Sequence, residues 1–224
     1  MALVFLVRHA QASFGTHDYD RLSELGRQQS RWLGEYFRER GLRFARVVAG
    51  SLKRQQDTAR EILGVLRQDT ALIQTHEGLN EYHGEKLYAA YTQGADPVAH
   101  QKADYRGYWK TFRAAMLAWS RDELPGMPES WAEFAQRMQA GLHQGSAGLA
   151  RDEVGLVVSS GGAIGRIVSE LTGANAASAI EFNLQFRNTG FCELLAVGDG
   201  LRLTSINNIP HLERADRRQA ITFA

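Results

Sequence analysis

Short apolar segments alternate with amphipathic segments along the first third of the chain, and this alternation limits the possible folds more than any other feature. The apolar segments that we expect to be strands are residues 2–7, 44–50 and 71–75. The segments with apolar side chains at helical spacing are residues 24–40 and 51–67. Ser23 and Ser51 are their predicted N-caps. Because parallel neighbours need a long crossover connection, this β-α-β-α-β order predicts a mainly parallel sheet.

The alternation stops at residue 80. Residues 80–126 are rich in tyrosine and tryptophan and mostly helical in pattern, so we expect a helical insertion that caps one end of the sheet. The elements expected after it are a helix at 130–144, a buried strand at 154–159, a helix at 163–171 and a hairpin of 191–197 with 201–207. The last residues, 214–224, are expected to be a solvated tail. We therefore predict one α/β domain over 1–224, a three-layer α/β/α sandwich whose helical cap insertion spans about 80–126.

Composition excludes several classes of protein. Hydrophobic residues make up 44%, charged residues 23%, and there are only 4 prolines, which excludes a disordered or collagen-like chain. A formal charge of +1 gives no overall basic field, so we expect no nucleic-acid partner. The single cysteine, Cys192, excludes an intramolecular disulfide framework and a cysteine-rich zinc site. No apolar run approaches the roughly 20 residues that span a bilayer, so we expect a cytoplasmic protein with no membrane partner.

Polar side chains follow the predicted strands where each strand ends. Arg8 and His9 follow the first, Arg54 lies one turn into the helix after the second, and Glu81 follows the third. A Ser-Ser-Gly-Gly loop at 159–162 follows the fourth. Ligands of open α/β sheets bind at the carboxyl ends of strands, so these four loops are the expected site.

These residue types suit the chemistry of a phosphate ester. Two guanidinium groups and the N–H groups of a helix N-terminus can bind a dianion. A neutral imidazole, here His9, can attack phosphorus and carry the phosphoryl group covalently. Glu81 can give a proton to the leaving group, and the charge of a bound phosphate would raise the pKa of its carboxyl. On spacing alone, however, a polar pair at the end of a strand explains Arg8 and His9 equally well.

Six motifs, in order between residues 3 and 212, carry a family resemblance. They are Leu-Val-Arg-His-Ala-Gln at 6–11, Leu-Ser-Glu-Leu-Gly-Arg-Gln-Gln at 22–29, Ser-Leu-Lys-Arg-Gln-Gln-Asp-Thr-Ala at 51–59, Leu-Asn-Glu with a following glycine at 79–84, Val-Val-Ser-Ser-Gly-Gly at 157–162, and the Asn-x-x-x-His-Leu pattern at 207–212. Each motif is weak by itself, but the ordered set is specific. Together they resemble the histidine phosphatase superfamily, also called phosphoglycerate-mutase-like.

The resemblance implies a three-layer α/β fold with a helical cap, a small phosphorylated substrate, and neither a metal nor another cofactor. It implies that His9 is the nucleophile and forms a phosphohistidine, that Arg8 and Arg54 bind the phosphoryl group, and that Glu81 is the proton donor. Further expected substrate contacts are Ser160, Gly161, Gln11 and Ser13. Neither the substrate nor the oligomeric state can be read from the sequence.

Three positions depart from the family's pattern. Ala10 replaces the signature glycine, which is costly only if its φ is positive. Gly15 stands where many members have a phosphate-contacting asparagine. Ser160 stands where the family has a second histidine, and loss of such a donor costs roughly 10²–10³ in rate in other enzymes. His83 and His211 are the candidates to replace it, although an ordinary structural histidine is the preferred interpretation of each.

The favoured function is a metal-independent phosphomonoesterase of the histidine acid phosphatase type, acting through His9. A phosphoglycerate-mutase-type phosphomutase is one alternative. A catalytically weak protein that binds a phosphorylated ligand is another, because Ser160 replaces the second histidine. A serine hydrolase built on Ser160 is disfavoured, because Val158 stands where the Gly-x-Ser-x-Gly elbow needs glycine.

Overall fold

The computed structural model describes residues 1–13, 20–198 and 200–223. The described residues form one six-stranded sheet in the order β3-β2-β4-β1-β5-β6. Its strands are β1 (Ala2–Arg8), β2 (Arg46–Ala49), β3 (Ile73–Thr75), β4 (Val154–Ser159), β5 (Phe191–Val197) and β6 (Gly200–Asn208). The first four strands of that order run parallel, whereas β5 and β6 are antiparallel to their neighbours. The predicted mainly parallel sheet and the C-terminal hairpin are confirmed.

Successive side chains of the central strands point into two different cores. Leu6 and Val157 join a core with the helices on one face, whereas Phe5, Val7 and Val158 join a core on the other. This burial on both faces explains why the strands read as continuous apolar runs. The register pairs Arg8 with Ser159, so the parallel strands deliver their carboxyl ends to one edge of the sheet.

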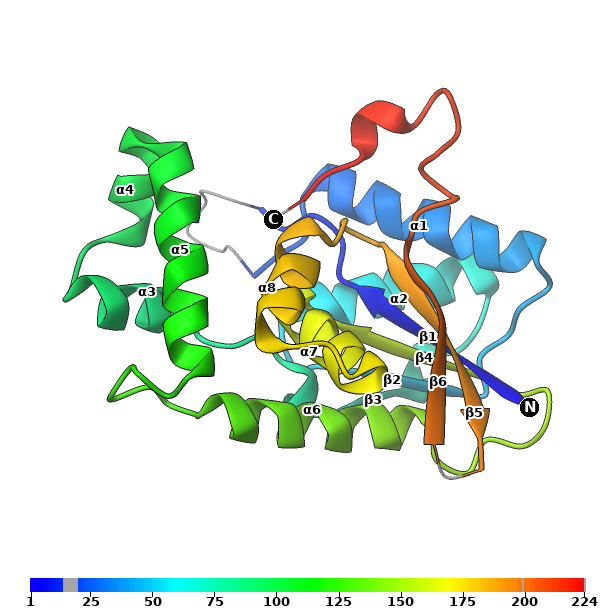
Figure 1. Cartoon of the computed structure of the whole chain (residues 1–224). Coiled ribbons are helices and arrows are strands. Elements are labelled where there is room, and N and C mark those ends of the chain that lie inside the picture. Colours follow the sequence, from blue (N-terminus) through cyan, green and yellow to red (C-terminus); the bar gives the residue numbers. More distant parts are fainter. Residues whose placement is uncertain (14–19, 199, 224) are drawn as a thin grey trace.

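Helices cover both faces of the sheet, as Figure 1 shows. One layer contains α1 (Glu24–Glu39) and α2 (Lys53–Leu66), and the other contains α6 (Trp131–Ser146), α7 (Gly161–Thr172) and α8 (Ala176–Gln185). Ser23 caps α1 by accepting a hydrogen bond from the Gly26 N–H, and Ser130 begins α6 with a capping box. The predicted three-layer α/β/α sandwich is confirmed.

The segment expected to form the cap contains α3 (Gly84–Thr92), α4 (Pro97–Ala103) and α5 (Tyr105–Ser120), which lie together at one end of the sheet (Figure 1). Its buried aromatic side chains, Tyr88, Phe112 and Trp119, belong to the same core as α6 and α7. Within the described residues, no helix is both long and apolar enough to cross a bilayer. That residues 1–224 form one domain stays a prediction.

Two expected helix starts are wrong. Helix α2 begins at Lys53, and its start is held by the Asp20 carboxylate, which accepts from the Lys53 N–H at 2.8 Å. Ser51 does not cap it, because its hydroxyl instead accepts from the Asn80 amide at 2.8 Å. Helix α7 begins at Gly161 rather than at 163, so the glycine pair forms its first turn.

The end of the chain also differs from the prediction. Helix α8 was not predicted; its N-cap, Asn175, accepts from the Ser178 N–H. The expected solvated tail is wrong in part, since Ala220 is buried and the Arg217 guanidinium lies over the Trp32 ring. The aromatic face and the nearby Glu35 carboxylate hold Arg217 against α1.

Candidate active site

His9 directly follows β1, at the sheet edge where the parallel strands end. Its backbone N–H donates to the Ser159 carbonyl at 2.9 Å, which continues the pairing of β1 with β4. Its own carbonyl accepts from the Asn188 side chain at 3.2 Å and from the Thr189 N–H at 3.4 Å. His9 is only 6% exposed. The sheet edge and the 188–189 loop therefore fix the backbone that carries the imidazole.

The contacts of the imidazole assign its proton. His9 Nδ1 lies 2.8 Å from the Ala10 carbonyl oxygen, which can only accept, so Nδ1 carries the hydrogen. The Arg54 Nε–H points at His9 Nε2 at 3.2 Å, as a donor does toward a lone pair. Burial, followed by the charges of Arg54 and Arg8, holds the pKa of His9 well below its usual value. The ring is therefore neutral, and its electron pair lies on Nε2, where it accepts the hydrogen bond from Arg54.

Two guanidinium groups lie beside this ring. Arg54 comes from the first turn of α2, and its Nη1 donates to the Asp20 carboxylate at 2.7 Å. Asp20 thereby bridges Arg54 and the backbone N–H of Lys53. Arg8, the last residue of β1, is buried and donates to the carbonyl of Phe186. The two arginines supply positive charge at the imidazole, as binding of a dianion requires.

Glu81 lies on the loop after the 3₁₀ helix Glu77–Leu79 and reaches the same site. Its carboxylate accepts from the Gly162 N–H at 2.9 Å and from the Tyr82 N–H at 3.3 Å. Burial raises the pKa of Glu81, although the Gly162 hydrogen bond and the charges of Arg54 and Arg8 oppose this shift. Desolvation is therefore the cause of the raised pKa of Glu81.

The family model of the histidine phosphatase superfamily (branch 1) matches residues 4–209. The chain belongs to this superfamily. A Broad-specificity phosphatase of Saccharomyces cerevisiae is 26% identical over 113 residues. That match spans 47% of this chain and 49% of the yeast protein, so the chain aligns with about half of the curated relative's length.

Several solved structures share the fold. Phosphoserine phosphatase from Entamoeba histolytica, in complex with 3-phosphoglyceric acid, superposes with a TM-score of 0.67 at 20% identity and covers 95% of this chain and 100% of its own. Phosphoglycerate mutase from Bacillus anthracis gives 0.66 at 17% identity, with 94% of each chain covered. The mycobacterial glucosyl-3-phosphoglycerate phosphatase, bound to inorganic phosphate, gives 0.64 at 21%, with coverage of 94% and 99%. At these identities the likeness establishes the fold.

Ser160, which the sequence resemblance predicts to stand in place of the superfamily's second histidine, is fully buried. Its hydroxyl oxygen accepts from the Gln55 Nε2 at 2.9 Å, and the same amide nitrogen donates to the Leu79 carbonyl at 3.0 Å. Gln55 is also fully buried. The Ser160 side chain therefore packs against an amide that the sequence analysis did not single out.

The residues just after His9 make hydrogen bonds to the segment at 21–23. The Gln11 side chain accepts from the Ser23 hydroxyl at 2.7 Å, and the Ser13 N–H donates to the Arg21 carbonyl at 2.7 Å. Ala10 is not among the residues with positive φ, so its methyl group causes no backbone strain. Gly15 lies outside the described residues. Gly161 packs beside Arg8, since an added Cβ would lie 3.4 Å from the Arg8 Cζ.

The two histidines considered as replacements for the second histidine occupy different places. His83 is exposed at the N-cap of α3. His211 is buried, and its Nε2 lies 2.8 Å from the Thr189 hydroxyl. Burial, reinforced by the charge of Arg217, lowers the pKa of His211 to about 3. His211 thus reaches the site only through Thr189, whose N–H donates to the His9 carbonyl.

Tyr82 joins the acid loop to the cap. Its hydroxyl accepts from the Asn183 amide of α8 at 3.0 Å and donates to the Met116 sulfur of α5 at 3.3 Å. Its ring packs against Phe112 and Trp119 of α5. The backbone next to Glu81 is therefore anchored in the aromatic core of the cap.

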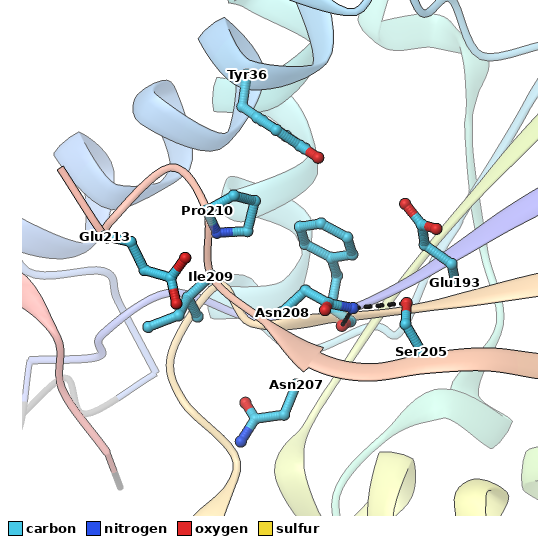
Figure 2. A pocket seen from close by; sticks show the side chains of 9 residues that line it. Tyr36, Glu193, Ser205, Asn207, Asn208, Ile209, Pro210 and Glu213 are labelled. Atoms are coloured by element: carbon cyan, nitrogen blue, oxygen red, sulfur yellow. Dashed lines mark hydrogen bonds between the residues drawn. The ribbon is translucent and has the colours of Figure 1, made fainter.

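A separate cavity of about 400 Å³ lies between α1 and the C-terminal strands. Figure 2 shows Tyr36, Glu193 and Glu213 around it, with the Asn208 amide turned to Ser205. None of the residues predicted for the site lines this cavity.

Proposed function

We propose that this chain is a metal-independent phosphomonoesterase that works through a phosphohistidine on His9. The observation that carries the proposal is the arrangement of the imidazole. Its Nδ1–H is held by the Ala10 carbonyl, its Nε2 carries the lone pair, and Arg54 lies 3.2 Å from that nitrogen. A neutral, buried imidazole beside two guanidinium groups suits attack on a phosphate monoester better than it suits a structural role.

In the first step, His9 Nε2 attacks phosphorus, a P–N bond forms, and the P–O bond to the leaving group breaks. Arg8 and Arg54 stabilise the charge on the phosphoryl oxygens. Glu81, which its raised pKa keeps protonated to a higher pH than usual, gives its proton to the departing oxygen. The product alcohol leaves, and the phosphoryl group stays on the imidazole.

In the second step, water attacks the phosphorus of the phosphohistidine. The Glu81 carboxylate takes the proton from the water, the P–N bond breaks, and inorganic phosphate is released. His9 and Glu81 return to their starting protonation states, so the atoms and charges balance over the cycle. Gly161, Gln11 and Ser13 are proposed substrate contacts at the edge of this site, and Ser160 is proposed to act beside them through its hydroxyl.

Two alternatives stand beside the phosphatase, and only the second of them is motivated by Ser160. A phosphoglycerate-mutase-type phosphomutase would keep the phosphohistidine away from water, and a weakly catalytic protein would only bind the phosphorylated ligand. Retention of Arg8, His9, Arg54 and Glu81 in one site supports the phosphatase over the binder. The substrate is proposed to be a small phosphorylated molecule; phosphoserine and 3-phosphoglycerate are suitable first compounds.

The test is hydrolysis of p-nitrophenyl phosphate between pH 5 and pH 8 in the presence of EDTA. Wild type is compared with His9→Ala and with His143→Ala, an exposed histidine on α6 that serves as the matched control. We expect activity that survives EDTA, persists in His143→Ala and disappears in His9→Ala. Equal activity in wild type and His9→Ala would overturn the proposal. Transfer of phosphate between positions of phosphoglycerate without release would favour the mutase.

A further inference from the structure

We infer that the C-terminal segment of the chain, through Thr222, closes a ring of hydrogen bonds that positions the nucleophile loop, residues 9–11. The inference rests on the proposed function of His9. The side chains in this ring are Asn188, Thr222 and Gln29; Gln29 ends the motif at 22–29, whereas Asn188 and Thr222 lie outside the motifs that suggested the family. We assign them as positioning residues, because they act on the imidazole through the backbone.

The ring starts and ends on the nucleophile loop. The Asn188 Nδ2 donates to the His9 carbonyl at 3.2 Å, and the Asn188 Oδ1 accepts from the Thr222 hydroxyl at 2.9 Å. The Thr222 oxygen in turn accepts from the Gln29 Nε2 at 2.9 Å. The Gln29 Oε1 then accepts from the Gln11 N–H at 2.9 Å. The side-chain amides of Asn188 and Gln29 each donate through nitrogen and accept through oxygen, and the Thr222 hydroxyl both donates and accepts.

The two amide side chains of this ring are buried, so the loss of one of their hydrogen bonds is costly. Gln29 is fully buried and Asn188 is 2% exposed, so water cannot replace a lost partner without a rearrangement. The tail is also held by its backbone, since the Asn188 N–H donates to the Thr222 carbonyl at 3.0 Å and Gln29 donates to the Ala220 carbonyl at 2.8 Å. In Figure 1 the C-terminal segment accordingly lies beside the start of α1.

The ring reaches the imidazole through one peptide plane. The Gln11 N–H that Gln29 holds belongs to the same rigid peptide unit as the Ala10 carbonyl. That carbonyl accepts the His9 Nδ1–H at 2.8 Å and so sets the direction of Nε2. If Gln29 lost its orientation, this peptide plane would be free to turn, and the imidazole would turn with it. A small misplacement of a reacting atom lowers the rate steeply.

The test uses Thr222→Val, which removes the hydroxyl at nearly constant volume, and Thr222→Ser, which keeps it. Thr204→Val is the matched control, because Thr204 is an exposed strand threonine whose hydroxyl donates to the Glu193 carbonyl. We measure kcat and KM with p-nitrophenyl phosphate and the hydrogen exchange of the Gln11 amide. We expect Thr222→Val to lower kcat about tenfold or more, to change KM less than about twofold, and to speed exchange at Gln11. Thr222→Ser and Thr204→Val should resemble wild type.

Two results would overturn the inference. Unchanged exchange at Gln11 in Thr222→Val would show that the ring does not hold the loop. Faster exchange with an unchanged kcat would show that the ring holds the loop without positioning the nucleophile. Failure of the proposed function is distinct, because wild type itself would then hydrolyse nothing, while the exchange measurement would still decide whether Thr222 holds residues 9–11.

Discussion

The backbone N–H of Gly162 donates to the Glu81 carboxylate at 2.9 Å, so the first turn of α7 holds the proposed proton donor. The approach is close: a Cβ added at Gly162 would lie 2.4 Å from the Glu81 Oε1 and 2.3 Å from the Tyr82 Cε1. Gly162 is not among the residues with positive φ, so the backbone conformation does not require glycine. Glycine is needed here because a Cβ would not fit.

Gly162→Ala should lower both activity and stability. The added methyl group must push the Glu81 carboxylate or the Tyr82 ring out of place, and overpacking of this kind costs about 1–3 kcal/mol. Urea unfolding would measure the loss, and kcat for an alkyl phosphate would measure the displacement of the acid. Gly64→Ala, on α2 with nothing within 4 Å of the added Cβ, is the control. Equal activity in the two variants would contradict the assigned contact.

Glu81→Gln should discriminate between leaving groups. An alkoxide needs a proton to leave, whereas p-nitrophenolate leaves readily without one. We expect a loss of about 10²–10⁴ in kcat/KM for an alkyl phosphate and a much smaller loss for p-nitrophenyl phosphate. Glu77→Gln, an exposed neighbour in the 3₁₀ helix, should change neither. A uniform loss with both substrates would argue against Glu81 as the proton donor.

The pH dependence of kcat/KM should have two limbs. His9 must be neutral to attack, and burial and the arginines lower its pKa, so activity rises as pH increases through that lowered value. Glu81 must be protonated, and burial raises its pKa, so activity with an alkyl phosphate falls as pH increases through that raised value. Glu81→Gln should remove the alkaline limb and keep the acidic one. Survival of the alkaline limb in that variant would assign it to another group.

Ser160→His should be destabilising, and changing Gln55 at the same time should reduce the loss of stability. The larger imidazole has to enter a fully buried position where the Gln55 amide lies 2.9 Å from the serine oxygen. We expect Ser160→His alone to lose about 1–3 kcal/mol of unfolding free energy and the double variant with Gln55→Ala to recover part of it. A double-mutant cycle in urea measures this coupling. Strictly additive effects would show that Gln55 does not fill the space that a histidine needs.

Much of the fold could be predicted from the sequence, because the local pattern of apolar and capping residues agrees with the tertiary structure. The strands buried on both faces, such as β1 and β4, leave continuous apolar runs, and Ser23 carries an N-cap signal that the structure uses. The helix starts that failed depend on distant residues. Helix α2 is capped by Asp20 from a loop far away in the sequence, so Ser51 next to it was a misleading local signal.

The residues of the candidate site are also of two kinds: some are marked by a local sequence motif, and others only by contacts between distant parts of the chain. The motifs identified His9, Arg54 and Glu81, and the structure brings these three together at one sheet edge. Gln55 and Asn188, however, become relevant only through contacts made across more than 100 residues of sequence. The sequence offers one signal for such residues. It is a polar side chain at a position that the apolar pattern of a helix, or the end of a buried strand, predicts to be buried.

The proposed reaction depends on His9 carrying the phosphoryl group. The most direct measurement is to mix the protein with a phosphomonoester, quench the reaction in base, in which a phosphorus–nitrogen bond survives, and locate the phosphate by mass spectrometry. We expect phosphate on the peptide that contains His9 in wild type and none in His9→Ala. Turnover without any phosphorylated peptide, or phosphate found on Ser160, would contradict it.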